Sequence, residues 1–291
     1  MLRKTNRRIF VKDLALLTGA CLIPGLAFPK SNSSKMKLGL VTYQWGKDWD
    51  VPTLINNCST AKIYGVELRV EHAHGVEPSI SEARRKEVKK IFADSPVKIV
   101  GLGTNQQYDF IEPEKLKASI ERTKEFIKLG ADIGGSGVKV KPNAFHKEVT
   151  HAQTIEQIGK ALYEVGKFGA DHGQKIRLEV HGEETQELPN IKAIMDAANH
   201  PNVYVCWNCN DQDLIGQGLE ANFNLVKNKL GDTVHVRELN VGAYPYQQLM
   251  DLFIKMDYDG WILLECRTEP EDKVKALIEQ HEVFTRMTKQ K

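Results

Sequence analysis

The sequence lacks a strong excess of charge of either sign. Its 40 Lys and Arg residues nearly balance its 38 Asp and Glu residues, and the formal net charge is +2. A domain that binds duplex DNA usually has a clearly basic surface. The sequence therefore predicts no nucleic-acid partner.

Cysteine is scarce as well, with 5 residues in a chain of 291. Cys206 and Cys209 form a single C-x-x-C motif, and no second pair accompanies it. A zinc ribbon needs two such pairs. We interpret the two cysteines as small side chains of a pocket wall, with a redox or zinc role as the alternative.

The body of the chain also lacks a dinucleotide-binding motif and any linker that would separate two domains. No Gly-x-Gly-x-x-Gly motif opens a helix after the first predicted strand, which argues against a dinucleotide-binding fold. The glycine-rich stretch 133–137 precedes a strand and is poorly placed to hold a phosphate. Residues 36–291 contain no linker and no low-complexity tract, so we expect a single domain.

The one long apolar run lies at the N-terminus. Arg7 and Arg8 stand in the stretch NRRIFVK, and an apolar segment broken by Gly and Pro covers residues 14–28. A basic flank before a short apolar run is typical of a secretory signal, and the paired arginines indicate twin-arginine export. We expect residues 1–30 to be a signal peptide and residues 31–291 to be an exported, periplasmic protein without a stable membrane span. A disordered tail or an uncleaved anchor is the alternative.

From residue 36 onward, short apolar runs alternate with longer segments of helical spacing. The runs predict strands at 37–42, 65–70, 97–102, 137–140, 176–180, 203–206, 234–239 and 262–264. Helices are predicted from residue 50 and at 79–92, 112–129, 154–172, 189–199, 246–256 and 271–287. About eight strand-helix repeats in this length are typical of an α/β, single-domain (β/α)8 TIM barrel with a parallel sheet. An open doubly wound sheet is the structural alternative.

Charged residues occupy alternate positions near the ends of several predicted strands. These sets are Glu67, Arg69 and Glu71; Lys139 and Lys141; Glu179 and His181; His235 and Arg237, with Glu238 beside them; and Glu265 and Arg267. Successive side chains of a strand point to opposite faces, so the charges of each strand share one face. Buried charges are costly unless they are paired or bound to a metal. The pattern therefore indicates one polar site where the strand ends converge.

The residues at these strand ends include a candidate metal site. In a (β/α)8 barrel the active site lies at the C-terminal ends of the strands. Glu179, His235 and Glu265 end the fifth, seventh and eighth predicted strands, and Asn208 and Asp211 follow the sixth. Such oxygen and imidazole ligands suit Mn²⁺, Mg²⁺, Co²⁺ or Zn²⁺. Salt bridges to neighbouring arginines are the alternative for each glutamate.

Five stretches between residues 36 and 288 resemble the xylose isomerase-like TIM barrels: GVELRVEHAHGVEP, KIRLEVHG, VYVCWNCND, TVHVREL and YDGWILLECR. This family of sugar phosphate isomerases and epimerases includes ketose 3-epimerases and relatives of endonuclease IV. The resemblance implies metal ligands at Glu179, Asn208, His235 and Glu265. Asn208 departs from the family, in which an Asp is usual. Its amide oxygen can coordinate a metal but adds no charge, and Asp211 is a candidate substitute from the following loop.

The resemblance also implies catalytic roles for Glu179 and Glu265. One carboxylate takes a proton from the carbon next to a carbonyl that the metal polarises, and the other returns it from the opposite face of an enediolate. Substrate contacts are expected among other side chains near the strand ends: Trp45, Arg69, His72, His74, Lys139, Lys141, His181, Arg237 and Arg267. For the basic ones, pairing with neighbouring glutamates is the alternative.

These observations predict a divalent-metal-dependent isomerase or epimerase of a small-molecule sugar or keto-sugar. One alternative is an exported lyase or hydrolase of oxidised glycosides on the same barrel. Another is a carbohydrate binder without a metal. An abasic-site endonuclease would need three zinc ions, more His and Asp ligands and a basic face, so we do not expect one. Homo-oligomerisation is left open by the sequence.

Overall fold

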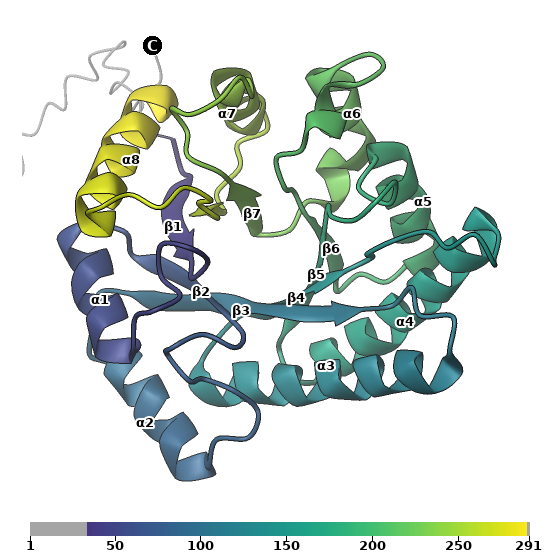
Figure 1. Cartoon of the computed structure of the whole chain (residues 1–291), viewed down its shortest axis with the longest axis horizontal. Coiled ribbons are helices and arrows are strands. Elements are labelled where there is room, and N and C mark those ends of the chain that lie inside the picture. The colour runs from purple at the N-terminus through teal and green to yellow at the C-terminus, as the bar shows by residue number, and fades with distance from the viewer. Residues whose placement is uncertain (1–33, 290–291) are drawn as a thin grey trace, which may run out of the picture. The chain divides into compact units, whose positions relative to one another are not determined.

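Eight short parallel strands form one sheet that curls around on itself, and helices cover its outer face (Figure 1). The computed structural model describes residues 34–289. The strands are β1 (Lys37–Val41), β2 (Gly65–Arg69), β3 (Lys98–Gln107), β4 (Gly137–Lys141), β5 (Lys175–Glu179), β6 (Val203–Cys206), β7 (Thr233–Val236) and β8 (Trp261–Leu264). They are joined in the order β6-β5-β4-β3-β2-β1-β8-β7. This arrangement confirms the predicted α/β barrel.

A helix follows each strand along the chain. The helices are α1 (Val51–Thr60), α2 (Glu82–Ala93), α3 (Pro113–Ile133), α4 (His151–Asp171), α5 (Leu188–Ala198), α6 (Leu219–Val226), α7 (Tyr246–Lys255) and α8 (Lys273–Thr288), with short 3-10 helices η1 (Asp211–Leu214) and η2 (Lys227–Lys229) on either side of α6. The Asp50 carboxylate starts α1 by accepting a hydrogen bond from Thr53 N at 2.9 Å. An N-cap of this kind satisfies a backbone donor that the helix leaves free. None of the helices between residues 34 and 289 combines the length and apolar character needed to cross a membrane.

The strand and helix predictions hold to within a few residues, with two exceptions. β3 continues past Leu102 to Gln107, because its polar end still pairs with β4. The sequence does not predict α6, which is only 8 residues long and follows Gly218 in a left-handed conformation (φ 83°). The predicted signal peptide at residues 1–30 lies outside the described residues.

The barrel closes between β6 and β7 without a regular ladder in the described chain. Two backbone hydrogen bonds make the closure: His235 N donates to Trp207 O at 2.7 Å, and Gly231 N donates to Val205 O at 2.8 Å. The first of these bonds involves His235 and the residue next to Asn208. Closing the barrel therefore brings together two strands that carry predicted site residues.

The inward face of the barrel accommodates long charged side chains. Arg177 on β5 is fully buried, and it donates to Asp232 Oδ1 and Val100 O at 3.1 Å each. Glycines on the neighbouring strands make room for it. A β-carbon on Gly137 would lie 2.8 Å from Arg177 Cζ, and one on Gly101 would collide with Nη1. The outward faces of the strands instead carry apolar side chains that pack under the helices.

Arg177→Met is expected to lower the free energy of unfolding by about 2 kcal/mol, because Asp232, Val100 O and Ser136 Oγ each lose one buried donor. Asp232 keeps its bond from Lys175, and Val100 O keeps its bond from Ser136 Oγ. Urea denaturation followed by circular dichroism measures the change. Lys160→Met, which removes an exposed ion pair with Glu156, is the matched control and should stay within about 0.5 kcal/mol of the wild type. An Arg177→Met protein as stable as the control would contradict this role.

Candidate active site

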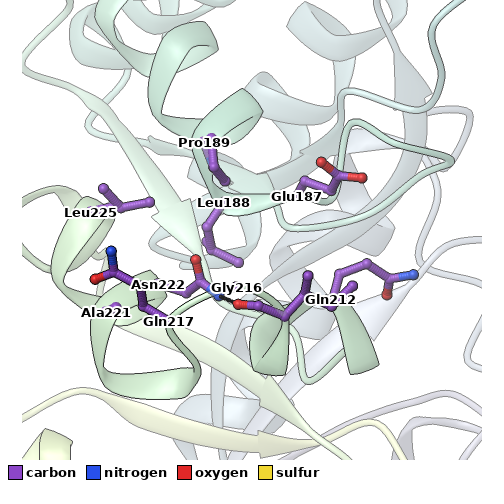
Figure 2. Close-up of a pocket in the computed structure, with 10 residues that line it drawn as sticks. Glu187, Leu188, Pro189, Gln212, Gly216, Gln217, Ala221, Asn222 and Leu225 are labelled. Carbon is purple, nitrogen blue, oxygen red and sulfur yellow. Dashed lines mark hydrogen bonds between the residues drawn. The ribbon is translucent and has the colours of Figure 1, made fainter.

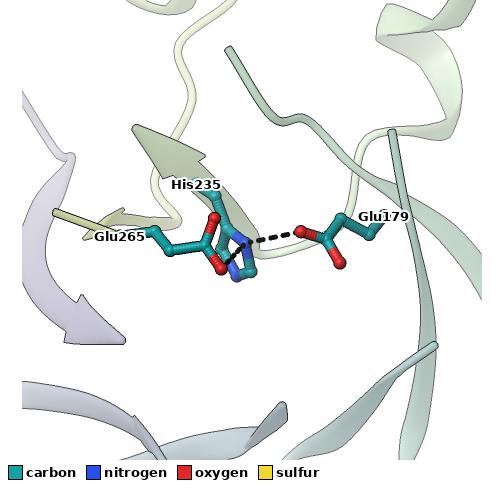
Figure 3. A group of neighbouring side chains, drawn as sticks. All are labelled: Glu179, His235 and Glu265. Atoms are coloured by element: carbon teal, nitrogen blue, oxygen red, sulfur yellow. Dashed lines mark ion pairs between the residues drawn. The ribbon is translucent and has the colours of Figure 1, made fainter. Parts of the chain in front are cut away.

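Two glutamates and a histidine meet at the C-terminal ends of three strands (Figure 3). Glu179 ends β5, His235 lies on β7, and Glu265 directly follows β8. His235 Nδ1 is 3.5 Å from Glu179 Oε1 and 3.9 Å from Glu265 Oε1. The two carboxylates approach the imidazole from opposite sides. The structure thus brings three of the four predicted metal ligands into one buried group, with one ligand atom of each within 4.8 Å of the others.

A third carboxylate holds the other ring nitrogen of His235. Glu67 Oε1, on β2, lies 3.1 Å from His235 Nε2, and both side chains are fully buried. Gly103 makes room for Glu67, since a β-carbon there would lie 2.6 Å from Oε1. A metal-binding histidine commonly donates its second N–H group to a carboxylate, which fixes the ring. Glu67 thus faces Nε2 at ion-pair distance, while Nδ1 faces Glu179 and Glu265.

Glu179 receives hydrogen bonds on both carboxylate oxygens. Lys139 Nζ donates to Oε2 at 2.7 Å and also to Thr104 O at 3.2 Å. Asn208 Nδ2 donates to Oε1 at 3.0 Å. Lys139 and Glu179 are each 1% exposed, so they form a buried ion pair. The structure thus places Lys139, predicted as a substrate contact, beneath the mouth as the partner of Glu179.

The surroundings of the two glutamates shift their pKa values in opposite directions. Burial opposes the ionised form of Glu179, but Lys139 and His235 hold the pKa of Glu179 well below its usual range. Burial, reinforced by the charge of Glu179, raises the pKa of Glu265. Two carboxyl groups separated in this way suit a charged base and a protonated acid.

The donor set fits a divalent cation. Three buried carboxylates face one buried ammonium group: Glu67, Glu179, Glu265 and Lys139. When all three carboxylates are ionised and the imidazole is neutral, the protonation state that a bound cation favours, this group carries two negative charges in excess. Asn208 Oδ1 is buried and accepts no hydrogen bond from the described residues, so one oxygen remains free to coordinate. Asn208 would therefore join Glu179, His235 and Glu265 as the ligands, and these atom types suit several divalent metals.

The loop after β6 holds Asn208 in place. Asn210 Nδ2 donates to the Asn208 carbonyl oxygen at 3.2 Å. Asp213 Oδ2 in turn accepts hydrogen bonds from Asn210 N at 3.0 Å and from Tyr244 Oη at 2.6 Å. Asp211, the candidate substitute ligand, is exposed and is not part of the Glu179–His235–Glu265 group. The loop thus offers Asn208, and not Asp211, to the site.

Several basic side chains predicted as substrate contacts lie near this group without an acidic partner. Arg69 Nη2 and Lys141 Nζ donate to the same oxygen, Asn105 Oδ1, at 3.2 and 3.3 Å. His72 Nε2 is 3.3 Å from Arg69 Nη1, and His181 is half-buried with Nδ1 unpartnered. Within residues 34–289, no carboxylate lies within 4.0 Å of the charged nitrogens of Arg69, Lys141, Arg237 or Arg267. The alternative of pairing with neighbouring glutamates is therefore not observed for these four.

Two side chains predicted as substrate contacts have structural roles instead. Trp45 is 2% exposed, and its Nε1 donates to Thr268 O at 2.9 Å, so the ring packs in the core. His74 is also buried. Val76 N donates to its Nδ1 at 3.0 Å, and its Nε2 lies 2.7 Å from Arg69 O. Neither side chain has a surface or a ring nitrogen left for a substrate, and we correct both assignments accordingly.

Glu67 and Asn105 belong to the site but are missing from the predicted ligands and substrate contacts. Glu67 does share the alternating pattern of GVELRVEH, but the family resemblance assigns ligands only to the fifth to eighth strands. Asn105 lies in the polar extension of β3, where the apolar signal of a strand has already ended. Its position two residues beyond Gly103 is the only signal in the sequence that it faces inward.

A hollow of about 420 Å³ lies outside the barrel, between the start of α5 and the segment from η1 to α6 (Figure 2). Its lining residues include Glu187, Leu188, Gln212, Ile215, Asn222 and Leu225. Glu187 is the single ionisable side chain in this lining. The hollow contains no group of metal ligands and no acid–base pair, so we assign no chemistry to the hollow.

The fold and the site together define a class: an α/β barrel with an acid-rich centre at the carboxyl ends of its strands. The model of the xylose isomerase-like TIM barrel matches residues 55–287, and the chain belongs to this family. No curated protein matches the sequence.

Solved structures with the same fold have low sequence identity to this chain. A 3-keto-D-glucoside 4-epimerase from E. coli is 14% identical, with 86% of this chain and 99% of that chain covered and a TM-score of 0.73. A D-psicose 3-epimerase from Clostridium cellulolyticum with D-tagatose is 15% identical, with 88% and 100% covered and a TM-score of 0.72. An IOLI protein with a bound zinc atom is 13% identical, with 87% and 98% covered and a TM-score of 0.73.

Asp213→Asn is expected to change the pH dependence of stability. Burial raises the pKa of Asp213 to about 7, so the folded protein holds a proton there that the unfolded chain releases near pH 4. The wild type should therefore lose stability relative to Asp213→Asn as the pH rises from about 4 to about 7, by up to about 4 kcal/mol. Urea denaturation at several pH values measures the difference. Asp171→Asn, at an exposed position, should give a constant difference, and a constant difference for Asp213→Asn would contradict the assignment.

Asn208→Asp is expected to strengthen Mn²⁺ binding at least about tenfold, because it adds a charge to the donor set. Asn208→Ala should weaken binding, because it removes the oxygen. Isothermal titration calorimetry and the Mn²⁺-induced rise in Tm measure both effects. Asn224→Asp on the exposed side of α6 is the control for added charge. Equal Mn²⁺ affinity in the wild type and Asn208→Ala would remove Asn208 from the ligand set.

Proposed function

We propose that this protein is a divalent-metal-dependent isomerase or epimerase of a sugar or keto-sugar, which takes a proton from the carbon next to a carbonyl. One observation carries the proposal: Glu179 and Glu265 approach His235 from opposite sides. A substrate held between two carboxylates presents opposite faces of its reacting carbon to them. Removal of the proton on one side and its return on the other inverts that centre.

Glu179 acts as the base and Glu265 as the acid in this proposal. Lys139, which donates to Glu179 at 2.7 Å, keeps this carboxylate ionised. Glu265 has no ammonium partner among the described residues, and burial raises its pKa, so of the two carboxylates Glu265 takes up a proton more readily. The ammonium group of Lys139 also offsets the negative charge that develops on an enediolate.

A divalent cation held by Glu179, Asn208, His235 and Glu265 would polarise the substrate carbonyl and acidify the adjacent C–H group. Glu67 contributes by fixing the orientation of the His235 ring. The names of structural neighbours support the sugar class and the metal: one is an L-ribulose 3-epimerase, one a D-psicose 3-epimerase, and one carries a zinc atom.

A lyase or hydrolase of keto-glycosides is the second candidate. The structural neighbour that is a 3-keto-D-glucoside 4-epimerase favours a glycoside with a ring carbonyl. Abstraction of the same kind of proton would then expel a leaving group from the next carbon. Release of free aglycone from a 3-keto-glucoside distinguishes this candidate.

We also propose export to the periplasm from the twin-arginine pattern at Arg7 and Arg8. Export suits an enzyme of glycosides that are found outside the cell.

Incubation with hydroxyketones in D₂O and Mn²⁺ is expected to exchange the C–H hydrogen next to the carbonyl, which proton NMR detects. Glu265→Gln removes the acid and should slow product formation by at least about 100-fold. Glu282→Gln, at an exposed position of α8, is the matched control and should retain full activity. Absence of exchange across neutral and anionic hydroxyketones, or full activity in Glu265→Gln, would overturn the proposed function.

A further inference from the structure

Arg69 and Lys141 form a pair of cations at the barrel mouth. They come from β2 and β4, on either side of β3, and both donate to Asn105 Oδ1 on β3. A neutral amide oxygen is thus the shared acceptor for two positive charges. We call these three residues the Arg69–Asn105–Lys141 cluster.

No carboxylate of the described residues lies within ion-pair distance of this cluster, and the charges of Glu179 and Glu265 reach Lys141 only from further away. Glu179 accepts hydrogen bonds from Lys139 and Asn208, and Glu67 holds His235. Arg69 makes its other contacts with His72 and with the Tyr43 ring, 5.2 Å from the guanidinium carbon. Within residues 34–289, the cluster therefore carries two positive charges without an acidic partner.

The surroundings of Lys141 disfavour its charge. The side chain is half-buried, and burial together with the charges of Lys139 and Arg69 lowers the pKa of Lys141. Partly buried like charges are costly without a counterion. An anion bound at the cluster would supply the missing charge.

We infer that the substrate is an anionic keto-sugar whose carboxylate or phosphate group binds between Arg69 and Lys141. This inference rests on the proposed function and specifies its substrate class. An arginine fork and a lysine ammonium together match the oxygens of both kinds of anion. Lys141 lies two residues beyond Lys139 on β4, so its Cα atom is about 7 Å further toward the mouth than that of Lys139. We therefore expect the anion to bind on the mouth side of the reacting centre.

Asn105→Asp provides a sharp test, because it installs a carboxylate where both cations already donate. Three probes are compared for binding by calorimetry with Mn²⁺ present: D-fructose, 5-keto-D-gluconate and D-fructose 6-phosphate. The wild type should bind at least one anionic probe at least about tenfold more tightly than D-fructose. This preference should disappear in Asn105→Asp, Lys141→Met and Arg69→Met, while Lys86→Met, at an exposed position of α2, should retain it. The two anionic probes separate a carboxylate site from a phosphate site.

Equal affinity of the wild type for all three probes would overturn the inference, as would an anion preference that survives in Asn105→Asp and Lys141→Met. Hydrogen exchange in D₂O, recorded on the same samples, separates this result from failure of the proposed function. Exchange with D-fructose and equal binding of all probes would reject only the anionic substrate. Tight anion binding without exchange on any probe would reject the proposed function and, with it, the substrate assignment.

Discussion

The burial of Glu179 against Lys139 is the interaction on which the rest of the site depends. A carboxylate and an ammonium group that are each 1% exposed are stable only because each finds a charged partner at 2.7 Å. This pair fixes the orientation of Glu179, and so determines which oxygen faces His235. The barrel interior is shaped around such groups, with Gly103 beside Glu67 and Gly137 beside Arg177.

The excess of carboxylates inside the barrel favours the binding of a divalent cation. The carboxylates outnumber the cations around His235, and protons supply part of the difference when no metal is bound. Burial opposes the charged form of His235, yet the neighbouring carboxylates of Glu67 and Glu179 raise its pKa well above the usual range. A divalent cation would take over that charge, and its binding would release protons. Because residue 208 is Asn and not Asp, the ligand set has one negative charge fewer.

The repeating strands and helices could be predicted because they depend on local patterns of apolar residues. Glu179, His235 and Glu265 could also be predicted, since alternation and the ends of parallel strands define their positions. The residues that contact these three side chains could not be predicted from the sequence. Glu67 meets His235 only because the barrel closes, and Asn105 lies on a part of β3 that carries no apolar signal. The burial of Trp45 likewise depends on a segment distant in the sequence, since Trp45 Nε1 donates to Thr268 O.

A crystal structure of the full chain soaked in Mn²⁺, with anomalous scattering recorded at the Mn edge, tests the central claim most directly. We predict one buried anomalous peak within about 2.5 Å of Glu179, His235 Nδ1, Glu265 and Asn208 Oδ1, with Glu67 still on Nε2 and Lys139 still on Glu179 Oε2. Absence of a peak at saturating Mn²⁺, or a peak at Asp211 or Asp213 instead, would contradict the account.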